Sequence, residues 1–310
     1  MADFARTAEL FDFQVNGFAG IDFQSSDLTL DDMVKAVEAL RRHSTTGILF
    51  TLITDRVDSL CRKLERIESL RRTDERVASV VRGYHVEGPW ISTEPGYFGA
   101  HPVHLACKPT LADYRRLSEA AQGNLKLITL APEVDGCLQV TEAATKDGVR
   151  ISLGHTNASE MEIDAAIEAG ATLATHVGNA VPLMLHRHDN IIQRLLARDE
   201  LIACLIPDGL HLPPSALKNF FRSKPSGCVF FTTDCMAAAA APPGRYTIGP
   251  HTVEVSSDGI VRLPGEKRFA GSSLTLEKGV DNVVNWLGLD YETAVGICST
   301  LPARHFGCDL

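Results

Sequence analysis

The sequence predicts an α/β protein built as a (β/α)₈ TIM barrel, and three observations support this. Short apolar runs alternate with amphipathic stretches along most of the chain, as expected for alternating strands and helices. Eight such repeats fit within roughly 230 residues, the usual size of one barrel. No dinucleotide-binding fingerprint follows the first strand and the chain contains no P-loop, so an open nucleotide-binding sheet is disfavoured.

The eight expected strands are short apolar runs bounded by turns. They cover residues 10–16, 47–53, 80–87, 125–132, 149–155, 171–177, 200–206 and 228–234. Between them, residues 30–43, 112–122 and 160–170 carry apolar side chains at helical spacing, and the third stretch ends on a glycine.

The pattern changes after the eighth strand. Residues 245–263 alternate like β-hairpins around Gly-Pro and Asp-Gly turns, and residues 273–288 and 290–307 are helical in pattern. We therefore expect one domain over residues 1–310, with barrel strands at about 10–234, a hairpin insertion at about 245–263 and C-terminal helices at about 273–307.

Composition narrows the function classes. The net charge of −9 disfavours nucleic acid and anionic membranes as partners, because both repel an acidic surface. We see no apolar run long enough for a spanning helix and no secretory signal at the N-terminus. The eight cysteines include no C-x-x-C pair, so we expect reduced thiols and a cytoplasmic protein.

Polar residues fall where the expected strands end, and a barrel carries its catalytic groups at those ends. The strand-end residues are Gln14, Asn16, Glu87, His155, His176 and Asp234. His155 and His176 are about one βα unit apart, so their side chains can reach a single ion from neighbouring strands. Carboxylate and imidazole ligands suit zinc, so the pattern predicts a metal site at this end of the barrel.

Nine motifs, in this order, resemble one known family over about residues 11–307. They read DFQVNGFAG, HVEGPW, FGAHP, SLGHTNA, ATHVGNAVP, PDGLH, TTD, AGSSLTL and PARHFG. The chain is similar to the N-acetylglucosamine-6-phosphate deacetylases of the amidohydrolase superfamily. The resemblance implies a (β/α)₈ barrel, a metal held by Glu87, His155 and His176, and a catalytic aspartate at Asp234.

The resemblance also implies roles in hydrolysis. Asp234 would accept a proton from the attacking water and pass it to the leaving amine, and His101 would donate a hydrogen bond to the acetamide oxygen. Many amidohydrolases carry H-x-H on the first strand, where this chain has Gln14 and Asn16. Amides are poor zinc ligands, so we expect one divalent ion per subunit, with the two amides hydrogen-bonding beside it. Zinc is expected, with Fe²⁺ or another divalent ion as alternatives.

A further set matches the family's substrate-binding positions. It comprises Ala100, His101, Asn179, Ala180, Arg187, Asp208, Gly209, Leu210, His211, Phe269, Ala270 and Gly271. Arg187 suits a phosphate because its planar guanidinium donates in pairs. The chain departs from the family in reading HRHDN after NAVP and in having Phe98 before the G-x-H loop, so a substrate without phosphate stays open.

Family members usually carry one small β-sandwich, built from segments that precede and follow the barrel in the sequence. This chain enters its first expected strand near residue 10 and ends just after residue 307. We therefore expect the sandwich to be absent or much reduced, and a homodimer or higher homo-oligomer to cover the exposed apolar surface.

The expected function is metal-dependent hydrolysis of the acetamide of N-acetylglucosamine-6-phosphate or a close N-acetylated amino-sugar phosphate. One alternative is another amidohydrolase, acting on an unphosphorylated N-acetyl sugar, a cyclic amide or a nucleobase. The strand over residues 125–132 ends without the lysine that dinuclear cyclic amidases carry there, which counts against that form. The other alternative is a non-catalytic, metal-binding paralogue.

Overall fold

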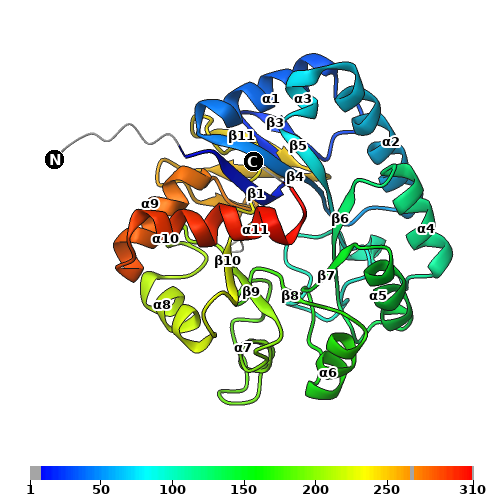
Figure 1. Cartoon of the computed structure of the whole chain (residues 1–310), viewed down its shortest axis with the longest axis vertical. Coiled ribbons are helices and arrows are strands. Elements are labelled where there is room, and N and C mark those ends of the chain that lie inside the picture. Colours follow the sequence, from blue (N-terminus) through cyan, green and yellow to red (C-terminus); the bar gives the residue numbers. More distant parts are fainter. Residues whose placement is uncertain (1–7, 266–268, 309–310) are drawn as a thin grey trace.

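The computed structural model describes residues 8–265 and 269–308. At its centre lies a curled sheet of eight parallel strands with helices around it (Figure 1). The strands are β1 (Leu10–Val15), β4 (Thr45–Leu52), β5 (Val81–Glu87), β6 (Leu125–Leu130), β7 (Arg150–Leu153), β8 (Leu173–Ala174), β9 (Ile202–Leu205) and β10 (Val229–Phe231). Each pairs in parallel with the next strand in this order. All eight predicted strands are therefore confirmed as one curled α/β sheet.

Helices connect the strands and cover the outside of the sheet (Figure 1). They are α1 (Leu30–Arg42), α2 (Val57–Thr73), α3 (Glu75–Ala78), the 3₁₀ turn η1 (Val103–Leu105), α4 (Leu111–Ala120), α5 (Cys137–Lys146), α6 (Glu160–Glu168), α7 (Ile191–Leu196), α8 (Pro214–Ser223), α9 (Leu276–Leu287), α10 (Tyr291–Val295), the π-helical turn η2 (Gly296–Thr300) and α11 (Leu301–His305). The predicted helices at 30–43, 112–122 and 160–170 correspond to α1, α4 and α6. The stretch 290–307 forms α10, η2 and α11 in succession.

Helix α1 shows how local sequence sets an element. Thr29 caps its N-terminus and forms a reciprocal capping box with Asp32, which satisfies backbone donors that the helix leaves free. Met33, Val37 and Leu40 lie on one buried face against the sheet. Basic residues occupy the last turn, where they complement the negative end of the helix dipole.

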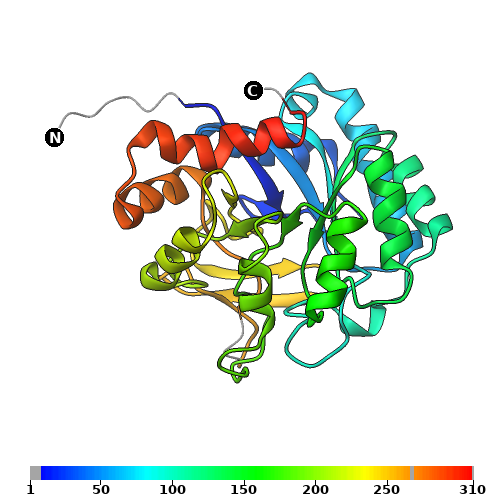
Figure 2. The same cartoon turned by 60° about the horizontal axis from the view of Figure 1, so that its bottom comes forward.

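The two ends of the curled sheet are covered by different elements (Figure 2). At the amino ends of the strands, Phe306, after α11, packs with Phe11, Phe13 and Phe230 in a cluster drawn from several strands. At the carboxyl ends lies a three-stranded antiparallel sheet of β11 (Gly244–Ile248), β12 (His251–Val255) and β13 (Val261–Arg262). This sheet falls in the predicted hairpin region, and its apolar side packs against Ile53.

A short antiparallel hairpin, β2 (Gly17–Phe18) and β3 (Ile21–Asp22), directly follows β1. No helix in the described ranges is both long and apolar enough to span a membrane. All eight cysteines lie in the described residues, and each is a free thiol.

Side-chain hydrogen bonds reinforce the junction between the first and last strands. One isolated bridge joins Val15 to Cys235, and the Asn16 backbone N–H donates to the Cys235 carbonyl oxygen at 2.7 Å. The buried Asp12 carboxylate accepts the hydroxyls of Thr232 and Thr233, each at 2.5 Å. These contacts fix the end of β1 against the segment that leads to Asp234.

Candidate metal centre and active site

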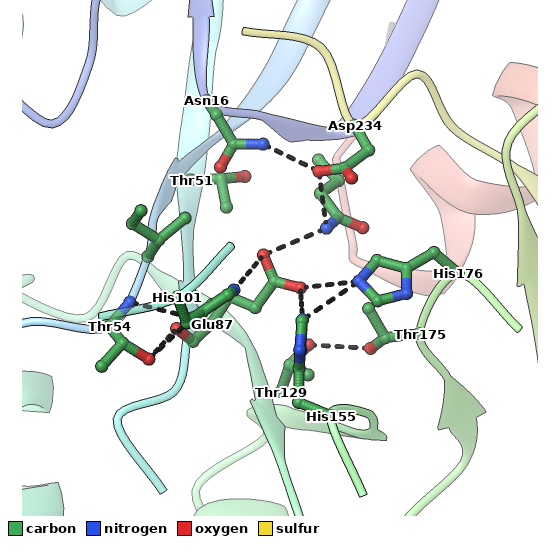
Figure 3. A network of polar contacts seen from close by, with 12 residues as sticks. Asn16, Thr51, Thr54, Glu87, His101, Thr129, His155, Thr175, His176 and Asp234 are labelled. Carbon is green, nitrogen blue, oxygen red and sulfur yellow. Dashed lines mark hydrogen bonds and ion pairs between the residues drawn. The ribbon is translucent and has the colours of Figure 1, made fainter. Parts of the chain in front are cut away.

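The strand-end residues of the sequence analysis converge at the carboxyl end of the sheet (Figure 3). Glu87 is the last residue of β5. His155 lies two residues after the end of β7, and His176 lies two residues after the end of β8. Asp234 lies three residues beyond β10. All four side chains are buried or nearly so, so any charge they carry must be balanced inside the site.

Three of these residues have backbone conformations that L-residues rarely adopt. The φ angles are +52° at His155, +28° at His176 and +50° at Asp234. Such positive values cost on the order of 1–3 kcal/mol each and persist only where the surroundings enforce them. The chain turns sharply at these points, and the turns bring the side chains together over the sheet.

Glu87, His155 and His176 form the one group of three or more potential ligand residues found in the described chain with all ligand atoms within 4.8 Å. Glu87 Oε1 lies 3.0 Å from His155 Nε2 and 3.1 Å from His176 Nε2, and the two nitrogens are 3.2 Å apart. Zinc with four ligands at about 2.0–2.1 Å holds its ligand atoms roughly 3.3 Å apart. The observed triangle therefore fits one small divalent cation.

The tautomer of His155 supports this fit. Its Nδ1 lies 3.1 Å from the carbonyl oxygen of Tyr97, which can only accept, so Nδ1 carries the proton. In the neutral ring Nε2 then presents a lone pair toward the Glu87 carboxylate and the Nε2 of His176. The Glu87 carboxylate and this lone pair are both acceptors and repel one another unless a cation or a proton lies between them. The donor set thus matches a metal centre.

The charge balance of the site favours ionised Glu87. Burial raises the pKa of Glu87, but contacts with His155 and His176 outweigh burial and leave the pKa well below its usual value. A carboxylate that stays ionised at neutral pH is ready to bind a cation.

Asp234 is held by two amides, that of Gln14 on β1 and that of Asn16 directly after it. Gln14 Nε2 donates to Asp234 Oδ1 at 3.0 Å and to Glu87 Oε2 at 3.2 Å, and Asn16 Nδ2 donates to Asp234 Oδ1 at 2.8 Å. Gln14 thereby bridges Asp234 and Glu87. Both bonds to Asp234 end on Oδ1, and within the described residues no hydrogen bond to Oδ2 is found.

Burial, followed by the negative charge of Glu87, raises the pKa of Asp234 to about 7. A carboxyl group with this pKa can both accept and release a proton near neutral pH.

His101 lies beside the triad, in the loop after β5. Its ring is 4.2 Å from the ring of His155, and its Nε2 is 3.8 Å from Glu87 Oε2. Burial, followed by the nearby His155, holds the pKa of His101 well below its usual value, so the ring is neutral. A neutral imidazole here can donate one hydrogen bond toward a bound carbonyl.

A layer of hydroxyl groups lies next to the metal triad inside the sheet. His85 Nε2 contacts Thr129 Oγ1 at 2.8 Å, and Thr129 Oγ1 lies 2.9 Å from Thr175 Oγ1. Burial lowers the pKa of His85 to about 4, so this histidine is neutral and serves the layer rather than the metal triad. The sequence pattern did not single out these threonines, although Thr175 directly precedes His176.

The predicted substrate residues form two groups. Near His155, a Cβ built on Gly99 would lie 3.3 Å from both the His155 ring and the Ala180 side chain, so the loop carrying Ala100 and His101 packs against this region. Asn179 Nδ2 donates to the carbonyl oxygen of His176 at 3.1 Å.

The second group lies around His211. Its Nδ1 is 2.6 Å from Asp208 Oδ2, and its ring centroid is 5.0 Å from that of Phe269. Gly209 and Leu210 belong to the same loop, and Ala270 and Gly271 follow Phe269 directly. The backbone N–H of Leu210 donates to Asp208 at 2.8 Å, which fixes the loop shape.

No contact between Arg187 and either group is found in the described residues. Arg187 lies on an exposed loop with Leu183 and Met184, and it makes no hydrogen bond or ion pair with the part of the chain that the structure describes. Thr54, which contacts His101, was not predicted from the sequence. The two residues are 47 positions apart, and no local motif links them.

Comparisons with known proteins identify relatives over nearly the whole chain. The N-acetylglucosamine-6-phosphate deacetylase of Mus musculus is 34% identical over 96% of this chain and 73% of its own length. The enzyme of the same name from Bacillus subtilis is 28% identical over 99% and 76%, respectively. The N-acetylgalactosamine-6-phosphate deacetylase of Escherichia coli O157:H7 is 31% identical over 98% and 80%. No family model matches the chain.

Solved structures agree with the sequence relatives. A mutant N-acetyl-D-glucosamine-6-phosphate deacetylase from Mycobacterium smegmatis, in complex with N-acetyl-D-glucosamine-6-phosphate, has a TM-score of 0.88 at 30% identity and covers 97% of this chain and 78% of its own. The Pasteurella multocida enzyme has a TM-score of 0.86 at 26% identity, covering 98% and 77%. Shared sequence, fold and motif order lead to one conclusion: the chain belongs to the N-acetylglucosamine-6-phosphate deacetylase family.

Proposed function

We propose that this protein hydrolyses the acetamide of N-acetylglucosamine-6-phosphate, or of a close N-acetylated amino-sugar phosphate, to the amino-sugar phosphate and acetate. The observation that carries the proposal is the convergence of Glu87, His155 and His176 beside Asp234, in a chain 34% identical to a deacetylase of that name. A non-catalytic metal-binding paralogue would not need a buried carboxyl group poised for proton transfer.

Glu87, His155 and His176 would hold one divalent ion per subunit, with Zn²⁺ suited to this oxygen and nitrogen donor set. When bound, the ion supplies Lewis-acid activation of water and of the amide carbonyl. Asp234 acts first as general base and then as general acid toward the departing amine, a role supported by its raised pKa. His101 donates to the carbonyl oxygen as negative charge develops there.

Gln14 and Asn16 keep Asp234 oriented through its Oδ1. This role is supported by their two hydrogen bonds to Oδ1, which leave Asp234 Oδ2 available for the proton. Because a neutral amide is a poor zinc ligand, we propose that the site binds one metal ion.

The substrate would lie across the two groups of loop residues. Ala100, Asn179 and Ala180 would line the acetamide side, and the loop Asp208–His211 with residues 269–271 would line the sugar. Arg187 would pair with the phosphate. The relative that acts on N-acetylgalactosamine-6-phosphate makes the galacto epimer a second candidate substrate.

Further proposals concern the whole chain. We propose that the curled sheet closes into a (β/α)₈ barrel and that residues 1–310 form one domain. In this proposal the sheet of β11, β12 and β13 is a hairpin insertion, and the family's small β-sandwich is absent or reduced. We also propose a homo-oligomer, a cytoplasmic location supported by free thiols, and a small-molecule substrate rather than nucleic acid or membrane.

A substrate panel tests the proposal. The purified protein, supplied with Zn²⁺, is assayed for amine release from N-acetylglucosamine-6-phosphate, its galacto epimer and the two unphosphorylated sugars. We expect at least about 100-fold higher kcat/KM for a phosphorylated sugar, as loss of a charge-assisted contact commonly costs a few kcal/mol. Metal-loaded protein that turns over none of the four would overturn the proposal.

A further inference from the structure

Thr54, two residues beyond β4, contacts the His101 ring on the side away from the metal triad (Figure 3). Its hydroxyl Oγ1 lies 2.7 Å from His101 Nδ1, and its backbone N–H points at the same nitrogen with an N···N distance of 3.4 Å. The other ring nitrogen, Nε2, faces the site, 3.8 Å from Glu87 Oε2. His101 and Thr54 are both buried, so water does not compete for these contacts.

These contacts settle where the ring proton lies. A backbone N–H can only donate, so the nitrogen that it points at must present a lone pair. The Thr54 hydroxyl has one proton, and its alternative acceptor, the Glu87 carbonyl oxygen, is 3.5 Å away against 2.7 Å for Nδ1. Nδ1 is therefore an acceptor for two donors of one residue, and in the neutral ring the proton is on Nε2.

The backbone leaves room for this hydroxyl at a particular glycine. A Cβ built on Gly88 would lie 2.1 Å from Thr54 Oγ1, which is far inside van der Waals contact. Gly88 has a φ of +78°, so two independent features exclude a side chain here. The glycine after Glu87 thus keeps open the space that the Thr54 hydroxyl occupies.

We propose that Thr54 is a positioning residue that fixes the Nε2–H tautomer of His101, so that this N–H points into the active site and donates to the acetamide oxygen. The proposal rests on the proposed deacetylase function for its catalytic consequence, but the tautomer itself is independent of any substrate. Without the hydroxyl, His101 would populate the Nδ1–H form, which presents a lone pair to the acetamide oxygen and repels it.

Three variants separate this role from simple packing. Thr54→Val keeps the side-chain shape and removes the hydroxyl, whereas Thr54→Ser keeps the hydroxyl. Thr141→Val is the matched control, because Thr141 is fully buried on α5 and its hydroxyl has no partner in the described residues. Thermal unfolding and metal content are measured for all three, and we expect the metal content of each to match the wild type.

The first readout is the ¹⁵N NMR spectrum of histidine-labelled protein, with the His101 signals assigned by their loss in His101→Asn. We expect a protonated Nε2 and an unprotonated Nδ1 in the wild type and in Thr54→Ser, and a mixture of tautomers in Thr54→Val. A protonated Nδ1 in the wild type would overturn the proposal, whatever the activity.

The second readout is steady-state kinetics with the best substrate of the panel. We expect Thr54→Val to lower kcat by about 10- to 100-fold with KM within about 3-fold of the wild type, because the lost donor acts on charge that develops in the transition state. Thr54→Ser should retain most of the activity, and Thr141→Val all of it. An unchanged kcat in Thr54→Val, or an equal loss in Thr141→Val, would overturn the proposal. An inactive wild type with the expected tautomer would overturn only the proposed function.

Discussion

Replacing Asp234 with asparagine tests the proton-transfer role most sharply. Asparagine retains Oδ1 as an acceptor for Gln14 and Asn16, whose donors lie at 3.0 and 2.8 Å, so the side chain should keep its orientation. The substitution replaces Oδ2 with an NH₂ group, which cannot accept a proton from water. We therefore expect the chemistry to change while the local structure persists.

The magnitude follows from the role. General acid–base catalysis contributes about 10²- to 10⁴-fold, so Asp234→Asn should lower kcat by that factor, equivalent to about 2.7–5.4 kcal/mol in activation free energy. Metal content should stay near that of the wild type, because no hydrogen bond from His155 or His176 to Asp234 is found in the described residues. Gln14 also keeps its donor to Glu87 at 3.2 Å.

The assay pairs kcat with metal content measured by mass spectrometry on the same preparations. Asp164→Asn is the matched control: it makes the same change on α6, where the carboxylate pairs with Arg198 at the surface, and it should leave kcat unchanged. Loss of metal together with activity would place Asp234 among the metal ligands. Near-normal kcat in Asp234→Asn would refute the proton-transfer role.

Three other substitutions give separate tests. Glu87→Gln should lower metal affinity by at least about 100-fold, measured by competition with a chelating dye, because a neutral amide replaces the charged ligand; unchanged affinity would remove Glu87 from the ligand set. Arg187→Ala should lower kcat/KM about 10-fold or more for the phosphorylated sugar and little for the free sugar; equal losses would contradict a phosphate contact. Glu68→Gln should destabilise the fold by about 2–4 kcal/mol in urea unfolding at pH 7, because the buried Glu68 carboxylate accepts from Arg71 and Tyr84. These partners outweigh burial and hold the pKa of Glu68 below its usual value of 4.5. The stabilisation by ionised Glu68 is therefore present above pH 4.5 and is lost as the pH falls through the folded-state pKa. A difference in unfolding free energy between Glu68→Gln and the wild type that does not shrink at low pH would contradict this.

The strands could be predicted from the sequence because burial on both faces makes them rich in apolar residues. β4, for example, is buried along nearly its whole length, and the apolar residues Ile48, Leu49, Phe50 and Leu52 make it readily recognised. The strand ends were predictable for the same reason, since a polar residue directly after a buried run needs a partner. Glu87, which ends β5, is such a residue, and its partners are His155 and His176.

Other features depend on contacts between distant residues, and no local pattern reports them. Asp12 accepts hydrogen bonds from Thr232 and Thr233, and the 220 positions between Asp12 and Thr232 hide the pairing. Thr54 has a similar relation to His101. A threonine after a strand looks like any turn residue until the neighbouring loop is in place.

The loop of Arg187 illustrates a different limit. The residue type suits a phosphate, but a match of position does not determine where a long exposed side chain lies.

The length of β8 also differs from the prediction: the apolar run at 171–177 predicts a longer strand than Leu173–Ala174. The chain leaves the ladder early because His176 turns, with its φ of +28°, toward Glu87 and His155.

The central claim is that a single cation is held by Glu87, His155 and His176. Anomalous diffraction at the zinc edge, from crystals of protein loaded with Zn²⁺, tests it most directly. We predict one strong peak per chain, within about 2.0–2.2 Å of one atom from each of the three side chains. No peak at this place, or a second peak beside Gln14 and Asn16, would contradict the account.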